Sequence, residues 1–236
     1  SLGMISLLHD DDAPDVLKLH RFATSWSSEA RHLEDSFENL NMDMSWQAGG
    51  VRCLRFGQRS SSVAKEYAPF AAVEDTANGV VWAAAVEALT PWQMEVSRYS
   101  DFVNISGGLP DREFANWFVD LKPGETLTAP AAIMTVCKGT FAHAARNLLA
   151  YQRTFEPNIR PLPVFSDWCT SWGKIEEERL LKVAEVAASL GVKHFSVDAG
   201  WFREDAPGEW ELNKELFPHS FKHFSDEISK RFGLKS

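Results

Sequence analysis

The sequence has few cysteines and no long apolar run. Its 236 residues include three cysteines, Cys53, Cys137 and Cys169, which lie far apart and in no metal-binding spacing. An odd number of widely separated cysteines is not a disulfide framework, so we expect free thiols in a reducing compartment. The apolar start at residues 4–8 runs into an acidic stretch, far short of the about 20 residues that a membrane helix needs. We therefore expect a cytoplasmic protein with no membrane partner.

Positive charge and phosphate-binding loops are also scarce. The 24 Lys and Arg residues stand against 33 Asp and Glu residues, which gives a net charge of −9. Binding to a nucleic-acid backbone needs a basic face, so nucleic acid is excluded as a partner. The glycine pairs at 49/50 and 107/108 precede neither a Lys nor a helix start, and we interpret them as turns. We expect no cofactor.

Residues 1–156 have the pattern of an antiparallel β-sandwich. Short β-branched or aromatic segments alternate with turn chemistry such as Asn78-Gly79 and Pro123-Gly124. Strands of this length at this spacing are typical of a sandwich. The clearest predicted strands are 80–86, 92–96 and 131–136, and one helix is predicted at 142–151, ahead of a proline-rich boundary at 157–163.

Residues 157–236 have a different pattern, in which strands alternate with helices. Leu180, Leu181, Ala184, Ala187 and Ala188 share one stripe of a predicted helix that ends before Gly191. Because parallel strands need a helical crossover, the order strand, helix, strand predicts a parallel sheet. The predicted elements are a strand at 163–168, a helix at 175–191, a strand starting at 195 and a helix at 219–231.

Short segments in a fixed order carry a resemblance to a known family. In the first part these are 19–22 (LHRF), 50–58 (GVRCLRFGQ), 69–75 (PFAAVED) and 107–114 (GGLPDREF). In the second part they are 165–168 (FSDW), 197–201 (VDAGW), 208–210 (GEW) and 217–218 (FP). Together they resemble the sandwich domain and the opening of the (β/α)8 catalytic barrel of the glycoside hydrolase family 36 α-galactosidases, or melibiases.

The resemblance implies a mixed β and α/β fold. An incomplete antiparallel β-sandwich (1–156) would precede the first βα units of a TIM barrel (157–236). It also implies retaining hydrolysis of terminal α-galactosides such as melibiose or raffinose, by two aspartates about 5 Å apart. The family's nucleophile follows a Lys-x-Asp-x-Asn motif, which does not occur in the 236 residues. We therefore expect an internal piece of an enzyme that holds no catalytic residue and is inactive alone. Its open sheet edges would need the remainder of the parent chain or a homo-oligomer.

Asp198 is the leading candidate ligand for a sugar. In the family an Asp-Asp-Gly-Trp segment at a barrel strand end binds galactose hydroxyls, and Asp198 matches its first aspartate. Ala199 stands in place of the second, which removes one acceptor and leaves the sugar specificity open. An ionised carboxylate accepts strong hydrogen bonds from hydroxyls. The alternative is that Asp198 only caps the loop that follows it.

Four further residues are candidates to line the same site. Flat aromatic faces suit the apolar faces of sugars, although core packing explains most tryptophans, including Trp82 and Trp92. Asp167 lies near the end of the predicted strand at 163–168. The alternative interpretation is that it is a solvated acid in a loop. The candidate lining residues are Asp167, Trp168, Trp201 and Trp210.

Two other interpretations need to be weighed. The chain could be a non-catalytic β-sandwich module that binds carbohydrate or contacts another subunit, but such a module has no use for the βα units after residue 160. His219 and His223 stand at helical i,i+4 spacing with Asp226 nearby, which could present metal ligands. No Glu follows His219 in the zinc-protease manner, so we interpret the pair as a solvated helix face and expect no metal.

Overall fold

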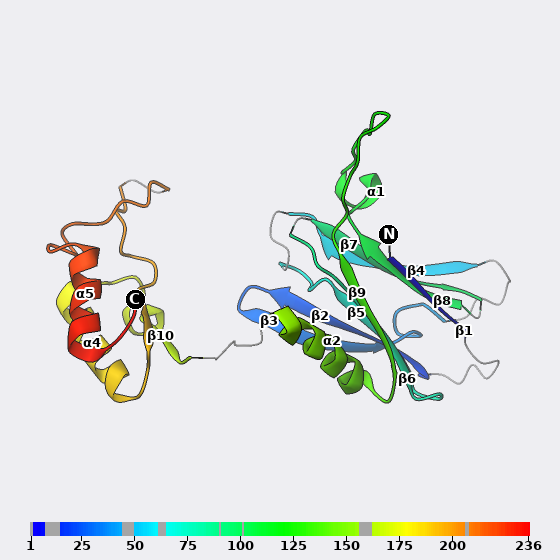
Figure 1. The fold of residues 1–236 in the computed structure, drawn as a ribbon, viewed down its shortest axis with the longest axis horizontal. Coiled ribbons are helices and arrows are strands. Elements are labelled where there is room, and N and C mark those ends of the chain that lie inside the picture. The colour runs from blue at the N-terminus through cyan, green and yellow to red at the C-terminus, as the bar shows by residue number, and fades with distance from the viewer. Residues whose placement is uncertain are drawn as a thin grey trace. The chain divides into compact units, whose positions relative to one another are not determined.

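The computed structural model describes two compact units, residues 1–157 and residues 158–236 (Figure 1). The described residues are 2–7, 15–43, 50–60, 65–89, 91–100, 102–155, 162–205 and 208–236. The predicted domain boundary at 156/157 lies outside these ranges. Among the described helices, none is both long and apolar enough to cross a membrane.

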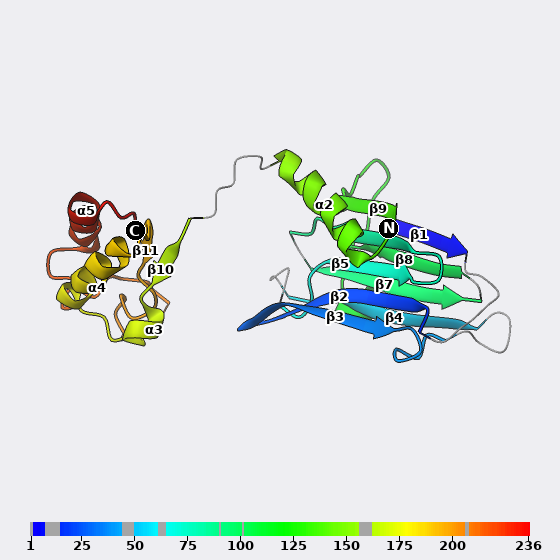
Figure 2. The same cartoon turned by 90° about the horizontal axis from the view of Figure 1, so that it is seen from below.

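The first unit is an antiparallel β-sandwich, as the sequence predicts (Figure 2). One sheet has the order β1-β8-β7-β4, and the other has the order β3-β2-β5-β6-β9. The strands of the first sheet are β1 (Leu2–Leu7), β4 (Val51–Gln58), β7 (Trp92–Tyr99) and β8 (Phe102–Gly108). Those of the second are β2 (Leu17–Ser25), β3 (Ser28–Ser36), β5 (Phe70–Asp75), β6 (Val80–Val86) and β9 (Ala132–Lys138).

The alternation of apolar residues explains how the sandwich forms its core. In β7 the side chains of Trp92, Met94 and Val96 are fully buried and their neighbours are only partly so, which is the period of two that a strand with one buried face requires. Trp82 is partly buried against the same core. Both tryptophans therefore belong to the sandwich interior, as predicted.

The glycines confirm one predicted turn and correct another. Gly79 has a φ of 59° between β5 and β6, in agreement with a tight turn. Gly107 is not a turn residue, because it lies within β8 and pairs with Met94. A Cβ atom there would lie 3.0 Å from the Met94 side chain and 3.1 Å from the Gln93 carbonyl oxygen. A side chain at position 107 would crowd the neighbouring strand β7, which explains why a glycine stands there.

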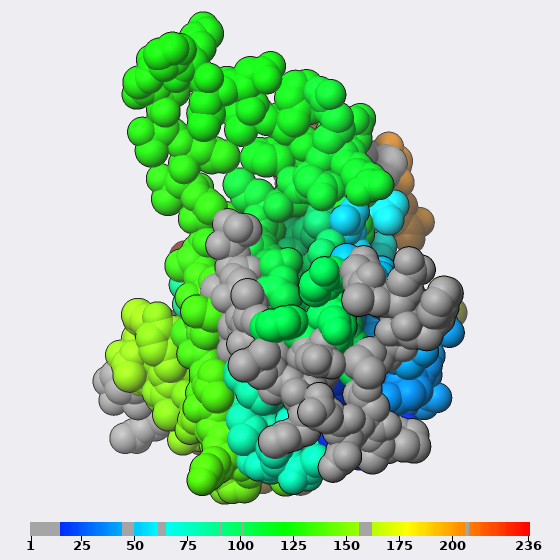
Figure 3. Space-filling view, turned by 90° about the vertical axis from the view of Figure 1, so that its right-hand side faces the viewer, coloured from blue at the N-terminus to red at the C-terminus, as the bar shows by residue number. Residues whose placement is uncertain are grey.

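A helix and a projecting segment complete the first unit. Helix α2 (Phe141–Phe155) is longer than the predicted 142–151, and its Ala144 and Leu148 pack on the five-stranded sheet. The short helix α1 (Arg112–Ala115) begins a segment that projects from the sandwich before β9 (Figures 1 and 3). Trp117 and Leu127 of this segment line a hollow at its base.

The second unit contains the predicted parallel strands and helices. Strands β10 (Val164–Ser166) and β11 (His194–Ser196) pair in parallel. Strand β10 is shorter than the predicted 163–168, and β11 begins one residue before its predicted start. Helix α3 (Trp168–Ser171) follows β10 directly. Helices α4 (Glu177–Ser189) and α5 (Phe221–Phe232) match their predictions within two residues, and Gly233 ends α5 in the left-handed conformation.

The core of the second unit lies between its two long helices and its strands. Phe195 of β11, Phe217 and Phe224 are each at most 1% exposed, and Leu180 and Ala184 of the predicted α4 stripe join them. Beyond α5, Lys235 forms an isolated parallel bridge with His194. The chain after α5 therefore runs beside β11 in the direction that a third parallel strand would take.

Candidate functional site

Asp198 lies two residues beyond β11 and is linked to the end of β10. Its Oδ2 accepts a hydrogen bond of 3.1 Å from the hydroxyl of Ser166, the last residue of β10. Its Oδ1 accepts the backbone N–H of Ala199 at 2.7 Å, so the loop-capping role is present. The side chain stays half-exposed, and each carboxylate oxygen has a further lone pair for another donor. Asp198 can therefore cap its loop and still accept external hydroxyls.

Asp167 is a buried positioning residue. It is 1% exposed, so the alternative of a solvated loop acid is wrong. Its Oδ1 accepts the backbone N–H of Asp198 at 2.6 Å, and its own N–H donates to the Ser196 carbonyl at 3.2 Å. Its Oδ2 has no hydrogen-bond partner among the described residues. In this structure the Asp167 carboxylate holds the backbone at Asp198 and does not face solvent.

A close approach of two glycines fixes the loop after Asp198. Gly200 has a φ of 111°, and a Cβ atom there would lie 2.3 Å from the carbonyl oxygen of Gly173. No side chain fits at that distance, and the positive φ also favours glycine. Gly173 follows α3, so the loops that leave β10 and β11 press together at this point. The glycine of the Asp-Ala-Gly-Trp segment is therefore needed for packing.

Aromatic side chains occupy both loops. Trp168, at the start of α3, is 37% exposed, and its ring centroid lies 5.6 Å from that of Trp172, which is 68% exposed. On the other loop the half-buried Trp201 lies 6.2 Å from Trp210, which is 63% exposed. Sequence reasoning missed Trp172. Its spacing of four residues from Trp168 at a strand end is the signal that could have found it.

A hairpin-like arrangement supports Trp201 and Trp210. Phe202 forms an antiparallel bridge with Leu212, and the Arg203 N–H donates to the Glu211 carbonyl at 2.9 Å. The Arg203 guanidinium also pairs with the Asp205 carboxylate at 2.6 Å and with that of Glu211 at 2.9 Å. These contacts tie the two sides of the loop together around the aromatic residues.

Comparison with known proteins finds relatives for the part of the chain that holds this geometry. The melibiase family model matches residues 129–235, which include all the elements of the site. The α-galactosidase Mel36A of Lactobacillus acidophilus is 28% identical over 144 residues, which are 56% of this chain and 19% of that protein. From residue 129 to residue 235 the chain is therefore similar to the melibiases.

Solved structures share the fold of this chain over 99% of its length. The α-galactosidase from Lactobacillus brevis aligns with a TM-score of 0.76 at 17% identity, over 99% of this chain and 30% of that one. A variant of the GH36 α-galactosidase AgaA from Geobacillus stearothermophilus, in complex with raffinose, aligns with a TM-score of 0.75 at 18% identity. That alignment covers 99% of this chain and 32% of AgaA.

The chain thus spans about a fifth of this curated relative and about a third of the solved structures. Both parts of the predicted fold, the sandwich and the opening of the barrel, lie within the aligned region. The structure brings Asp167 and Asp198 together through a direct hydrogen bond. It pairs Trp201 with Trp210, and it pairs Trp168 with Trp172 instead of with either of them.

Proposed function

We propose that this chain is part of a retaining α-galactosidase that hydrolyses terminal α-galactosides such as melibiose or raffinose. In this proposal residues 1–156 form the sandwich domain, and residues 157–236 form the first βα units of the catalytic barrel. The match of residues 129–235 to the melibiase family model and the names of the relatives support the activity. The raffinose complex of AgaA supports the substrate class.

The role of this chain would be to bind the sugar. The observation that carries the proposal is the bonded set at the carboxyl ends of β10 and β11, where Ser166 and Asp167 fix the half-exposed Asp198. Active-site loops of barrel enzymes begin at this edge of the sheet. Galactose hydroxyls would donate to Asp198, while Trp168, Trp201 and Trp210 would offer flat faces to the sugar. Ala199 supplies no second carboxylate, so fewer hydroxyls are recognised from this strand end.

The bond-breaking step would use groups on other barrel strands. In a retaining mechanism one carboxylate attacks the anomeric carbon while the other carboxylic acid protonates the leaving oxygen, and water then cleaves the covalent intermediate. The chain lacks the Lys-x-Asp-x-Asn motif of the family's nucleophile. We therefore propose that it holds no catalytic residue, and the chemistry itself calls for no cofactor.

We further propose that the short parallel pair of β10 and β11 is completed by more barrel strands or by another subunit. Two strands of three residues each leave sheet edges with unpaired backbone groups. The three free cysteines support a reducing, cytoplasmic location.

The test is to express the complete reading frame that encodes this chain and to assay it on raffinose. We expect hydrolysis with α-galactose as the first product, and no hydrolysis by the 236 residues alone. Asp198→Ala should lower kcat/KM by about 100-fold or more, because two charge-assisted hydrogen bonds are worth at least about 3 kcal/mol together. Asp226→Ala, an exposed acid on α5, is the matched control and should leave kcat/KM unchanged.

Two results would contradict the proposal. A complete product that binds galactose but cleaves no α-galactoside would favour the carbohydrate-binding module. Equal kcat/KM values for Asp198→Ala and Asp226→Ala would leave Asp198 with its loop-capping role only.

A further inference from the structure

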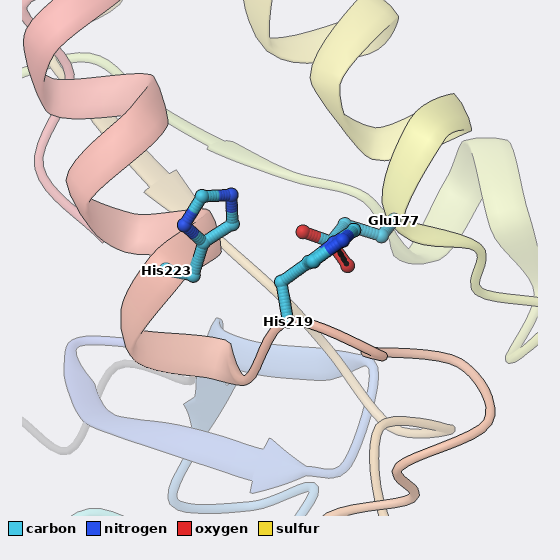
Figure 4. A group of neighbouring side chains, drawn as sticks. All are labelled: Glu177, His219 and His223. Carbon is cyan, nitrogen blue, oxygen red and sulfur yellow. Dashed lines mark ion pairs between the residues drawn. The ribbon is translucent and has the colours of Figure 1, made fainter.

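Helices α4 and α5 bring three possible metal ligands together. Glu177 lies in the first turn of α4, and His223 lies in the first turn of α5, four residues after His219. One ligand atom from each residue lies within 4.8 Å of the other two. Figure 4 shows the carboxylate and the two imidazole rings gathered between the helices.

Glu177 is the unusual member of this group. It is 8% exposed, and its Oε2 has no hydrogen-bond partner among the described residues. A buried carboxylate oxygen is normally paired, because burial without a partner loses the solvation of the charge. The His219 Nδ1 lies 3.4 Å from Oε2. A metal ion or a hydrogen-bond donor bound to Oε2 would lower the free-energy cost of burying this carboxylate.

The separation of 3.4 Å suits two ligands of one metal ion better than a hydrogen bond. Hydrogen bonds from nitrogen to oxygen centre near about 2.9 Å. Two atoms bound tetrahedrally to zinc at about 2.0 to 2.1 Å lie about 3.3 Å apart. His219 and His223 are both exposed, so small rotations of their side chains can bring their ring nitrogens to the same point.

We propose that Glu177, His219 and His223 form a zinc site that joins the N-terminal ends of α4 and α5. Two imidazoles and one carboxylate are a ligand set that zinc takes, with a water in the fourth position. Magnesium and calcium prefer oxygen ligands throughout and are disfavoured here. The helix N-termini carry partial positive charge, but this effect is small beside coordination by an ionised carboxylate.

The position of the site suggests what the metal does. A helix that follows a parallel strand begins near the carboxyl end of that strand. The N-terminal ends of α4 and α5 therefore lie at the same end of the strands as Asp198. The loop that carries Trp201 and Trp210 runs from β11 to His219. A metal bound to His219 fixes the far end of this loop, while β11 fixes the near end. Zinc binding would thus hold in place the loop that carries Trp201 and Trp210.

From the sequence alone, His219 and His223 were interpreted as part of a solvated helix face, because Glu177 is distant from them along the chain. Asp226, the acid nearest the histidine pair in sequence, bonds the Lys222 ammonium at 2.6 Å. Only the packing of α4 against α5 brings Glu177 to the two histidines.

The test is zinc binding to the tag-free 236-residue chain after treatment with a chelator. Isothermal titration with zinc chloride should show one site. His219→Ala, His223→Ala and Glu177→Gln should each weaken binding at least about tenfold, since even the loss of an outer-shell partner costs about that much. Matched controls are His143→Ala and Glu178→Gln, two exposed residues outside the group, and they should bind zinc normally.

A second readout separates binding from folding. Zinc should raise the unfolding temperature of the second unit in the unmodified chain and in the controls, but not in His219→Ala, because a ligand that binds the folded state stabilises it. His219 is exposed, so its removal leaves the core intact. The proposal is overturned by the absence of saturable zinc binding, or by binding that survives unchanged in both histidine variants.

Discussion

The two units of the chain hold their strands by different means. In the sandwich, β4 pairs with β7 along its whole length from Val51 to Gln58, whereas β10 and β11 share three residue pairs. The second unit depends instead on aromatic residues between its helices, such as Phe217 and Phe224. The groups suited to chemistry lie on this second unit, in loops with little sheet pairing beneath them. The sandwich therefore has the more extensive strand pairing, and the candidate site lies beside the shorter strand pair.

The largest effect should come from opening the core of the second unit. Phe224→Ala removes a fully buried ring, and such changes cost about 3 to 5 kcal/mol. We expect the second unit to unfold while the sandwich keeps its hydrogen-exchange protection. Phe37→Ala, at an equally buried position in the sandwich, is the matched change and should leave the second unit protected. Equal loss of protection in both units for either variant would show that they unfold as one body.

Gly200→Ala should be the next most damaging change. The new Cβ atom would meet the Gly173 carbonyl oxygen at 2.3 Å in a backbone conformation with positive φ. We expect a loss of about 2 kcal/mol or more in the stability of the second unit, measured by urea denaturation. Gly208→Ala is the control, because Gly208 has a φ of 92° but nothing within 4 Å of the added atom. It should cost about 1 kcal/mol. Similar losses for both variants would mean that the close approach contributes nothing.

Asp167→Ala should have a smaller and more local effect. It leaves the Asp198 N–H without its acceptor, at a cost of about 1 to 3 kcal/mol. Asp167→Asn keeps a carbonyl oxygen in reach and should retain most of the stability. Amide exchange at Asp198, followed by NMR, checks this directly. A slow Asp198 amide in Asp167→Ala would contradict the positioning role.

The smallest effect should be a pH dependence of the sandwich. His20 is 2% exposed, with its ring nitrogens 3.0 Å from His32 Nε2 and 3.1 Å from Glu74 Oε2. Burial lowers the pKa of His20 below its ordinary value, although the carboxylates of Glu74 and Glu34 oppose this. The unfolded chain therefore takes up the proton first. Stability should be complete above about pH 6.5 and should fall as the pH drops below it.

Urea denaturation at a series of pH values measures this dependence. His20→Asn should flatten the stability profile between about pH 7 and pH 5. His143→Asn, an exposed histidine of the same unit, should leave the slope as it was. A slope that persists in His20→Asn would assign the proton uptake to another group.

Local patterns explain what could be predicted from the sequence. The stripe of Leu180 and Ala184 predicted α4, and the short aromatic segment at 92–96 between turn residues predicted β7. These elements follow from side-chain periodicity and end signals, which need no knowledge of distant residues. Asp198 could be selected because it follows an apolar run that a helix precedes.

Contacts between distant segments explain what could not be predicted. Asp167 carries no sequence signal of burial, since its surroundings come from the loop after β11. Gly107 has the appearance of a turn residue, yet its role depends on Met94 in the neighbouring strand. Glu177 reaches the two histidines only through helix packing. In each case the partner is far along the chain, so local periodicity carries no information about it.

The contact between Gly173 and Gly200 has a consequence for how such a site can diversify. At this point the two loops meet through a carbonyl oxygen and an α-carbon, so the spacing between them is set without any side chain. Neighbouring positions, such as Trp172 and Ala199, can then be exchanged without moving the frame that holds Asp198. Single residues beside this backbone junction can therefore be substituted while the junction keeps the position of Asp198.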